Sequence, residues 1–203
     1  MSKTKIAVLV SGGGTNLQAL IDAQNAGIIQ SGEIVLVLSS KAGVYALERA
    51  AKANIDAHVV ERKKCADQAA YEAAIMEKLT EYGVEMIVLA GFLSILSKDF
   101  TDRWPGRILN VHPSLIPSFC GKGFYGLKVH EAALEYGVKV TGATVHFVNE
   151  VADGGAILLQ KAVDILPGDT AETLQRRVME EAEWKLLPRG TELVAKKILE
   201  EKK

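Results

Sequence analysis

Two polar side chains stand at the end of an apolar, strand-like segment in Asn110-Val111-His112-Pro113. Because successive side chains of a strand alternate between its two faces, Asn110 and His112 point to the same side. Pro113 favours an extended backbone at His112 and ends the strand there. An amide that stabilises an oxyanion, beside an imidazole that moves a proton, suits acyl transfer. The alternative is a purely structural pair, but the long Gly/Pro-containing loop that follows favours catalysis.

A glycine-rich turn, Gly12–Gly14, separates the first apolar segment from a helix that begins near Thr15 and Asn16. Glycines let the backbone turn sharply and approach a ligand, and a helix N-terminus offers N–H groups to an anion. No Lys-Ser/Thr pair follows, as a P-loop requires, and Leu17 stands where a dinucleotide motif needs its third glycine. The turn is therefore expected to bind a monophosphate.

A third candidate is Asp153, which is followed by two glycines between two β-rich segments. Asp-Gly is common in hairpin turns, so the residue has a structural explanation of its own. An imidazole acts better as base or acid when a carboxylate orients it, which makes Asp153 a candidate partner of His112. Among the other histidines, His58 and His146 are expected to pack in strands, and His130 is expected on a helix surface.

Alternating strands and helices would position these residues. The expected strands are Lys5–Val10, Glu33–Ser39, Ile55–Val60, Met86–Ala90 and Arg107–His112, and the expected helices are Asn16–Ala26, Val44–Ala53 and Cys65–Tyr82. Apolar strands without polar alternation, separated by helices, are typical of a parallel sheet covered on both faces.

The second half of the chain has a different pattern. Ser114–Gly126 is expected to be irregular, Leu127–Tyr136 to be a helix, and Lys139–Asn149 and Ala156–Ile165 to pair as an antiparallel hairpin. From Thr170 onward the pattern is helical, with an interruption expected at Pro188–Gly190. The predicted fold is α/β: one domain over residues 1–203 with a Rossmann-like open twisted sheet, mostly parallel, helices on both faces and an antiparallel C-terminal hairpin.

Composition narrows the function classes. Lys and Arg number 24 against 25 Asp and Glu, a net charge of −1, which argues against nucleic acid as the main partner. No spacing of His, Cys or acidic residues resembles a metal site. Two cysteines, Cys65 and Cys120, suit a reducing compartment, and no signal peptide or membrane-spanning apolar run is evident. A cytoplasmic protein without membrane contact is expected.

Nearly the whole chain resembles the folate-dependent formyltransferases. The resemblance runs, in the family's order, through VLVSGGGTNLQALID, VLAGFLSILS, ILNVHPSLIPSF, GATVHFVNEVADGGAILLQ and the final helix. It implies transfer of the formyl group of the co-substrate 10-formyltetrahydrofolate to the amine of glycinamide ribonucleotide (5'-phosphoribosylglycinamide), a step of purine (IMP) biosynthesis that needs no metal. The N-terminal half would bind the ribonucleotide and the C-terminal half the folate.

The resemblance also implies a role for individual residues. The catalytic residues would be Asn110, His112 and Asp153. The ribonucleotide would be held by Gly12, Gly13, Gly14, Thr15, Asn16, Pro113 and Glu183. The folate would lie, largely through backbone groups, against Gln68, Leu93, Ser94, Ile95, Leu96, Asn110, Asn149, Glu150, Val151, Ala152 and Asp153. Gln68 stands where close relatives often have an arginine near the folate tail, and Ser94 where some have a basic residue.

Two other functions stay open at this stage. A hydrolase that deformylates 10-formyltetrahydrofolate would use the same three catalytic residues, with water as the acceptor, and would have no use for the phosphate turn. A non-catalytic phosphate-binding module would explain the glycines but leave Asn110 and His112 idle. The subunit state, monomer or homodimer, is equally open.

Overall fold

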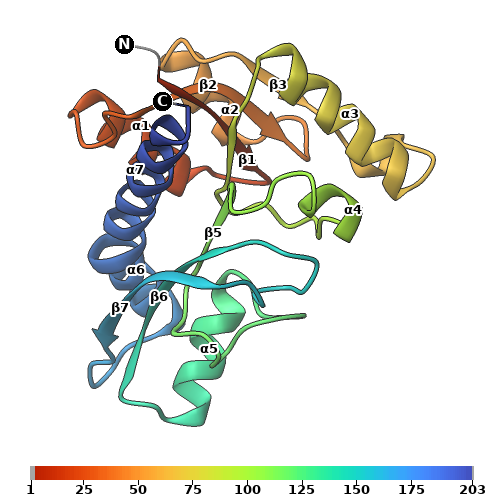
Figure 1. Cartoon of the computed structure of the whole chain (residues 1–203). Coiled ribbons are helices and arrows are strands. Elements are labelled where there is room, and N and C mark those ends of the chain that lie inside the picture. Colours follow the sequence, from red (N-terminus) through yellow and green to blue (C-terminus); the bar gives the residue numbers. More distant parts are fainter. Residues whose placement is uncertain (1–2, 203) are drawn as a thin grey trace.

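The computed structural model describes residues 3–202, and its framework is a seven-stranded sheet (Figure 1). The strands are β1 (Thr4–Val10), β2 (Gly32–Ser39), β3 (Ala57–Val59), β4 (Met86–Leu89), β5 (Ile108–His112), β6 (Val140–Phe147) and β7 (Ile157–Asp164). Their spatial order is β3-β2-β1-β4-β5-β6-β7; pairs from β3 to β5 are parallel, and β6 pairs antiparallel with both β5 and β7. The predicted fold class is confirmed.

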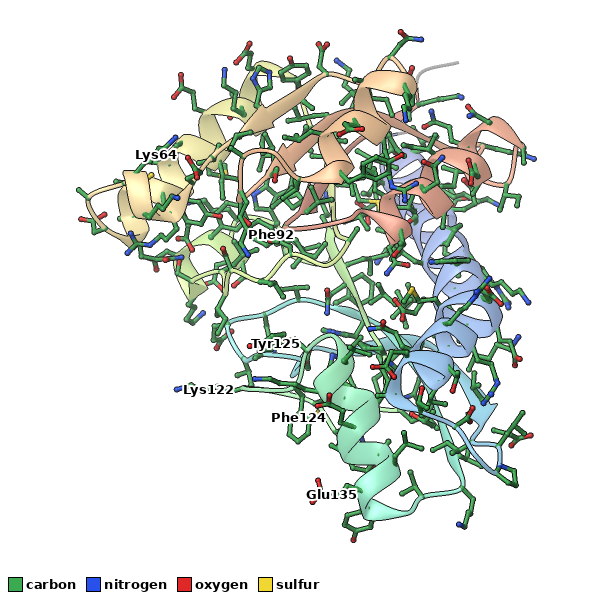
Figure 2. All side chains as sticks on the ribbon, turned by 180° about the vertical axis from the view of Figure 1, so that it is seen from behind. Lys64, Phe92, Lys122, Phe124, Tyr125 and Glu135 are labelled. Carbon is green, nitrogen blue, oxygen red and sulfur yellow. The ribbon has the colours of Figure 1, made fainter. Side chains whose placement is uncertain are left out.

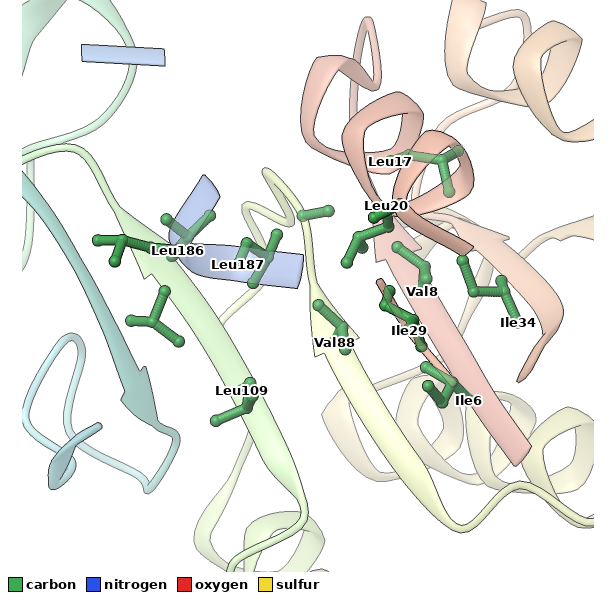
Figure 3. Close-up of a cluster of buried hydrophobic side chains, with 14 of the residues drawn as sticks. Ile6, Val8, Leu17, Leu20, Ile29, Ile34, Val88, Leu109, Leu186 and Leu187 are labelled. Atoms are coloured by element: carbon green, nitrogen blue, oxygen red, sulfur yellow. The ribbon is translucent and has the colours of Figure 1, made fainter. Parts of the chain in front are cut away.

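Helices cover both faces of this sheet. They are α1 (Thr15–Asn25), α2 (Tyr45–Lys52), α3 (Gln68–Glu81), α4 (Lys98–Thr101), α5 (Leu127–Tyr136), α6 (Ala171–Val178) and α7 (Trp184–Glu200). Along β1, Ile6 and Val8 join a core cluster with α1, α2, α6 and α7, whereas Ala7 joins the opposite cluster with α3 and α4. Figure 3 shows leucines of α1 and α7 gathered against the first face. Burial on both faces explains why β1 is apolar throughout.

The chain order creates a switch point between β1 and β4. After β1 the chain builds outward through β2 and β3, and it then returns to add β4 and β5 on the other side of β1. Connections therefore leave the carboxyl ends of β1 and β4 in opposite directions, which opens a crevice at that edge of the sheet. The glycine turn after β1, the segment after β4 and the end of β5 all lie at this edge.

Two predicted boundaries need correction. The helix expected over Cys65–Tyr82 begins only at Gln68, because the Asp67 side chain accepts a hydrogen bond of 2.7 Å from the Ala70 N–H and caps it. A short 3₁₀ turn, Arg62–Lys64, precedes it. The strand expected over Ile55–Val60 is only three residues long because β3 is the outermost strand and pairs with β2 alone.

The interruption expected at Pro188–Gly190 is wrong, since helix runs unbroken from Ala171 to Glu200. Pro188 is the fifth residue of α7, and α7 directly follows a π-helical turn at Met179–Glu183 that already departs from the regular hydrogen-bond pattern. Gly190 serves packing: a Cβ there would lie 3.0 Å from Val145 Cγ1 of β6. The absence of a side chain lets α7 approach the sheet closely.

His130 is fully buried, contrary to its expected place on a helix surface. It lies beside Val129 and three residues before Ala133, and these three side chains form the buried side of α5. Neither ring nitrogen of His130 has a hydrogen-bond partner within residues 3–202. Burial, helped by the nearby His112, lowers the pKa of His130 to about 4, so the imidazole is neutral at neutral pH.

No helix within residues 3–202 is long and apolar enough to span a bilayer.

The buried imidazole predicts a specific loss of stability in acid. Unfolding returns the pKa of His130 from about 4 to its ordinary 6.5, so its contribution is intact above 6.5 and is lost as the pH falls from 6.5 toward 4. Between about pH 7.5 and about pH 5 the wild type should lose about 2 kcal/mol of unfolding free energy that His130→Leu retains. Urea denaturation at both pH values measures this, and equal losses in the two proteins would contradict it.

Candidate active site

The ends of β5 and of the β6–β7 hairpin bring three of the predicted residues together. Asn110 and His112 project from β5, and the turn after β6 carries Asp153. The carboxylate Oδ2 of Asp153 lies 3.5 Å from His112 Nδ1. Both side chains are largely buried, so the attraction between them is only weakly screened by water. The imidazole thus has the partner carboxylate that its predicted chemistry requires.

Asp153 is held in place by its backbone and by the neighbouring loop. Its φ of 54° is left-handed, which is uncommon for residues other than glycine. Its Oδ2 accepts a hydrogen bond of 2.8 Å from the Gly121 N–H. Burial alone would raise the pKa of Asp153, but interactions with His146, His112 and Gly121 outweigh it and hold the pKa below its ordinary value. The carboxylate is therefore ionised at neutral pH.

His146 belongs to this site, although its sequence context indicated only a packing role. Its Nε2 lies 3.6 Å from Asp153 Oδ1 and 3.0 Å from Asn110 Nδ2. Its Nδ1 is 2.8 Å from the Phe147 carbonyl oxygen, which can only accept, so Nδ1 carries the hydrogen and Nε2 accepts from the amide. This contact fixes the orientation of the Asn110 amide. The antiparallel register, which pairs Asn110 with His146, brings them together.

The catalytic candidate His112 has an oxygen near each ring nitrogen. Nδ1 faces Asp153, and Nε2 lies 2.9 Å from the Phe119 carbonyl oxygen in the loop after β5. Burial lowers the pKa of His112, against the opposing effects of Asp153 and that carbonyl. The neutral ring dominates at neutral pH, and the carbonyl assigns its single hydrogen to Nε2. Nδ1 is then left with a free lone pair.

These groups open into two adjoining pockets. One, of about 340 Å³, is bordered by Asn110, His112 and Asp153, by the segment after β4 and by the loop Gly121–Gly126. Figure 2 labels Phe92 in the segment after β4, and Lys122, Phe124 and Tyr125 in the loop Gly121–Gly126. The other pocket, of about 100 Å³, is lined by most of the residues predicted to contact folate: Leu93, Ser94, Ile95, Leu96, Asn110, Asn149, Val151, Ala152 and Asp153.

Two residues predicted to contact folate lie outside the lining of these pockets. Gln68 stands at the start of α3 and donates a hydrogen bond of 3.1 Å to the Ile95 carbonyl, so it borders the outer end of the cleft. Glu150 is exposed on the turn after β6. Leu93, Ile95 and Val151 are apolar yet 55%, 60% and 57% exposed. Exposed apolar side chains around a cleft are typical of a surface that packs against a ligand.

The glycine turn after β1 has two kinds of glycine. Gly14 has a left-handed φ of 73°, and a Cβ on it would lie 2.7 Å from Ala46 Cβ, so the fold itself requires glycine there. A Cβ on Gly12 or Gly13 would meet no protein atom within 4 Å. These two glycines face open space at the N-terminus of α1, where backbone N–H groups lack helical acceptors. The arrangement fits an anion.

The acidic residue predicted near the ribose lies beside this turn. Glu183 Oε2 accepts a hydrogen bond of 2.6 Å from Asn16 Nδ2. Burial raises the pKa of Glu183 to about 7, although the Asn16 contact opposes the change. At neutral pH this buried carboxyl group is thus about half ionised. It accepts one hydrogen bond and lies beside the turn that fits an anion.

Arg49 of α2 supports the turn and was not singled out by the sequence. Its Nε donates to the Gly13 carbonyl at 2.9 Å, and its Nη1 donates to Gln18 Oε1 at 3.0 Å. Ser11 connects the same turn to the cleft, because its hydroxyl oxygen accepts a hydrogen bond of 3.0 Å from the Leu93 N–H.

Within residues 3–202, no group of three His, Cys, Asp or Glu side chains could hold a metal ion.

Comparison with known proteins relates the chain to one family. Residues 4–191 match the model of the formyl transferase family. The chain is 45% identical over 91% of its length to phosphoribosylglycinamide formyltransferase of Haemophilus influenzae, of which it covers 84%. It is 48% identical, over 96% of its length, to the trifunctional purine biosynthetic protein adenosine-3 of Gallus gallus, but it spans only 19% of that longer protein.

A solved structure gives the same answer for the fold. The crystal structure of glycinamide ribonucleotide transformylase 1 from Symbiobacterium toebii superimposes with a TM-score of 0.89 at 42% identity, covering 96% of this chain and 89% of that one. The family model, the relatives and the fold all agree, and we conclude that the chain belongs to the formyl transferase family.

Proposed function

We propose that the chain transfers the formyl group of 10-formyltetrahydrofolate to the amine of glycinamide ribonucleotide in purine biosynthesis. The observation that carries this proposal is the cleft in which Asn110, His112 and Asp153 meet, joined through Ser11 and Leu93 to an anion-binding turn. Family membership supports the reaction type, and the cleft and the glycine turn would each hold one reactant. No covalent enzyme intermediate is needed.

Asn110 is the proposed oxyanion donor. One hydrogen of its Nδ2 is directed to His146 Nε2, 3.0 Å away, and the other remains for the oxygen of the formyl group. Attack of the unprotonated amine on the formyl carbon forms a C–N bond and moves an electron pair onto that oxygen. A donor held in advance at this place stabilises the charge as it develops.

His112 is the proposed proton carrier. Its free Nδ1 accepts the proton that the attacking nitrogen releases, and Asp153, 3.5 Å away, stabilises the imidazolium that forms. The same proton passes to the folate nitrogen as the bond between that nitrogen and the formyl carbon breaks. His112 returns to its neutral form, so atoms and charges balance over the cycle.

The glycine turn and the adjoining cleft would hold the two substrates. The ribonucleotide phosphate would bind the N–H groups at Gly14, Thr15 and Asn16, with Glu183 toward the ribose and Pro113 beside the amine. The exposed apolar side chains at Leu93, Ile95 and Val151 suit the flat rings of a folate. The folate tail would leave the cleft past Gln68, which already contacts Ile95.

The wider assignments belong to the same proposal. Residues 1–203 would act as one domain, with the ribonucleotide held mainly by its N-terminal half and the folate by its C-terminal half. Both cysteines, Cys65 and Cys120, are free thiols, which suits a reducing cytoplasm. The chain would act as a monomer or a homodimer, and metal would take no part.

A coupled assay tests the function. Purified protein is mixed with 10-formyltetrahydrofolate, with and without glycinamide ribonucleotide, and both formyl transfer and free formate are measured. The proposal expects turnover only with the ribonucleotide and no net formate. Formate release that is undiminished without the ribonucleotide would identify a deformylase, and ligand binding without turnover would identify a binding module.

Removing the oxyanion donor gives the first kinetic prediction. Asn110→Ala should lower kcat by a factor on the order of 10² to 10³, because the developing charge loses a fixed donor. Steady-state kinetics measure the effect, and a urea unfolding curve confirms that the variant is folded. Near-normal turnover in a folded variant would remove Asn110 from the mechanism.

The two kinds of glycine in the phosphate turn give a matched pair. Gly13→Ala should fold normally but raise KM for the ribonucleotide at least about 10-fold, because its Cβ would occupy the open space used by the phosphate. Gly14→Ala should instead lose about 1–3 kcal/mol of stability, because its backbone is left-handed and Ala46 blocks the Cβ. The reverse pattern in kinetics and unfolding would contradict this assignment of the turn.

Glu183 gives a prediction for pH. With a pKa of about 7, its carboxyl group is mostly protonated near pH 6 and mostly ionised near pH 8, and only the ionised form accepts from both ribose hydroxyls. The ratio of ribonucleotide affinity in wild type to that in Glu183→Gln should therefore rise up to about 10-fold over that range. Calorimetric titration measures both proteins, and the ratio cancels ionisation of the ligand itself. A constant ratio would contradict contact with the ribose.

A further inference from the structure

The carbonyl of Phe119 is the acceptor nearest to His112 Nε2, at 2.9 Å. We propose that Phe119 is a positioning residue that fixes the tautomer of His112, so that the hydrogen stays on Nε2 and Nδ1 is the atom that exchanges protons with substrate. The role of Nδ1 in turnover rests on the proposed function, whereas the tautomer itself is a property of the free protein.

The backbone at Phe119 is held in an unusual conformation to make this contact. Its φ of 49° is left-handed, which non-glycine residues rarely adopt without support from their surroundings. The support comes from the aromatic ring, which packs edge-to-face against Phe124, at 6.4 Å between centroids, and Tyr136, at 6.0 Å. Phe124 belongs to the same loop and Tyr136 to the last turn of α5. The ring therefore ties the loop to a helix and aims the carbonyl.

The loop around Phe119 contacts both members of the catalytic pair. The Phe119 carbonyl accepts a hydrogen bond from His112. Two positions later, the Gly121 N–H donates a hydrogen bond of 2.8 Å to Asp153 Oδ2. At the start of the loop the Ser118 carbonyl accepts from the Ser114 hydroxyl, which fixes the approach to Phe119. A displacement of the Phe119 carbonyl would therefore disturb the hydrogen bonding of His112 while leaving the strand that carries it unchanged.

The other groups around His112 do not replace this carbonyl. Asp153 faces Nδ1, His146 of β6 lies on the far side of that carboxylate, and His130 of α5 is a buried neutral imidazole. Burial lowers the pKa of His112, and Asp153 and the Phe119 carbonyl each act to raise it. Without the carbonyl, the neutral ring gains by moving its hydrogen to Nδ1, where Asp153 accepts it. Nδ1 would then have no lone pair for the substrate proton.

Four variants separate the ring from the backbone. Phe119→Gly tolerates the left-handed backbone but removes the ring, and Phe119→Tyr keeps the ring. Tyr136→Ala removes one of the two rings that pack against Phe119. Tyr136 lies outside the loop and its side chain is 80% exposed, so this change puts the fold at little risk. Leu166→Ala, a change of a half-exposed apolar side chain on the turn after β7, is the control.

The first readout is ¹⁵N NMR of the histidine rings in the ligand-free protein near pH 7.5. The chain has four histidines, so the His112 signals are assigned by their loss in His112→Gln. The wild type, Phe119→Tyr and Leu166→Ala should have the hydrogen of His112 on Nε2. Phe119→Gly should shift the tautomer toward Nδ1–H and lower the pKa of His112, and Tyr136→Ala should do so in part.

The second readout is steady-state kinetics of formyl transfer. A displaced general base should lower kcat of Phe119→Gly about 10- to 100-fold while KM for both substrates stays within about twofold, and Phe119→Tyr should restore kcat. An unchanged His112 tautomer and pKa in both Phe119→Gly and Tyr136→Ala would overturn the proposal, whatever the kinetics. A shifted tautomer in a protein without formyl transfer would sustain it and refute only the proposed function.

Discussion

The pairing of β6 with β5 is the constraint on which the rest of the site depends. β5 supplies Asn110 and His112, and the His146 and Asp153 side chains that contact them arrive through its antiparallel neighbour. The register pairs Asn110 with His146 and His112 with Thr144. The Thr144 hydroxyl oxygen accepts a hydrogen bond of 3.1 Å from the Ile116 N–H, which anchors the start of the loop after β5. The turn between β6 and β7 then places Asp153 beside His112. A slip of one residue would turn His146 to the opposite face and remove the support of the Asn110 amide.

Burial sets the charges of this site as much as pairing does. It lowers the pKa of His112 and His130 and raises that of Glu183, in each case because the charged form loses hydration. Asp153 stays ionised, because interactions with two imidazoles and a backbone N–H hold its pKa below the ordinary value. At neutral pH the pair of Asp153 and His112 is therefore an anion beside a neutral base. Protonation of that base during the reaction completes an ion pair in a poorly hydrated place, where it is most stabilising.

Local sequence pattern was sufficient for features that depend on neighbouring residues. Buried parallel strands are apolar throughout, Asn110 and His112 share a face by alternation, and glycines mark the turn after β1. Features that depend on packing between distant segments were missed. His146 acquires its role from strand register, His130 is buried because α5 presents that side inward, and Arg49 meets Gly13 across 36 positions. Pro188 failed as a helix breaker because a π-helical turn precedes it, and single-residue propensity does not anticipate that.

Backbone groups as well as side chains build this candidate site. N–H groups at the start of α1 suit a phosphate, the Phe119 carbonyl holds His112 and the Gly121 N–H holds Asp153. Two of the three non-glycine residues with left-handed φ in residues 3–202, Phe119 and Asp153, lie in this site. For Phe119 and Asp153, which have a Cβ, the conformation costs on the order of 1 kcal/mol or more and persists only because surrounding contacts enforce it. The near-neutral net charge is compatible with the proposed phosphate site, because an anion held by peptide dipoles would need no cluster of lysines.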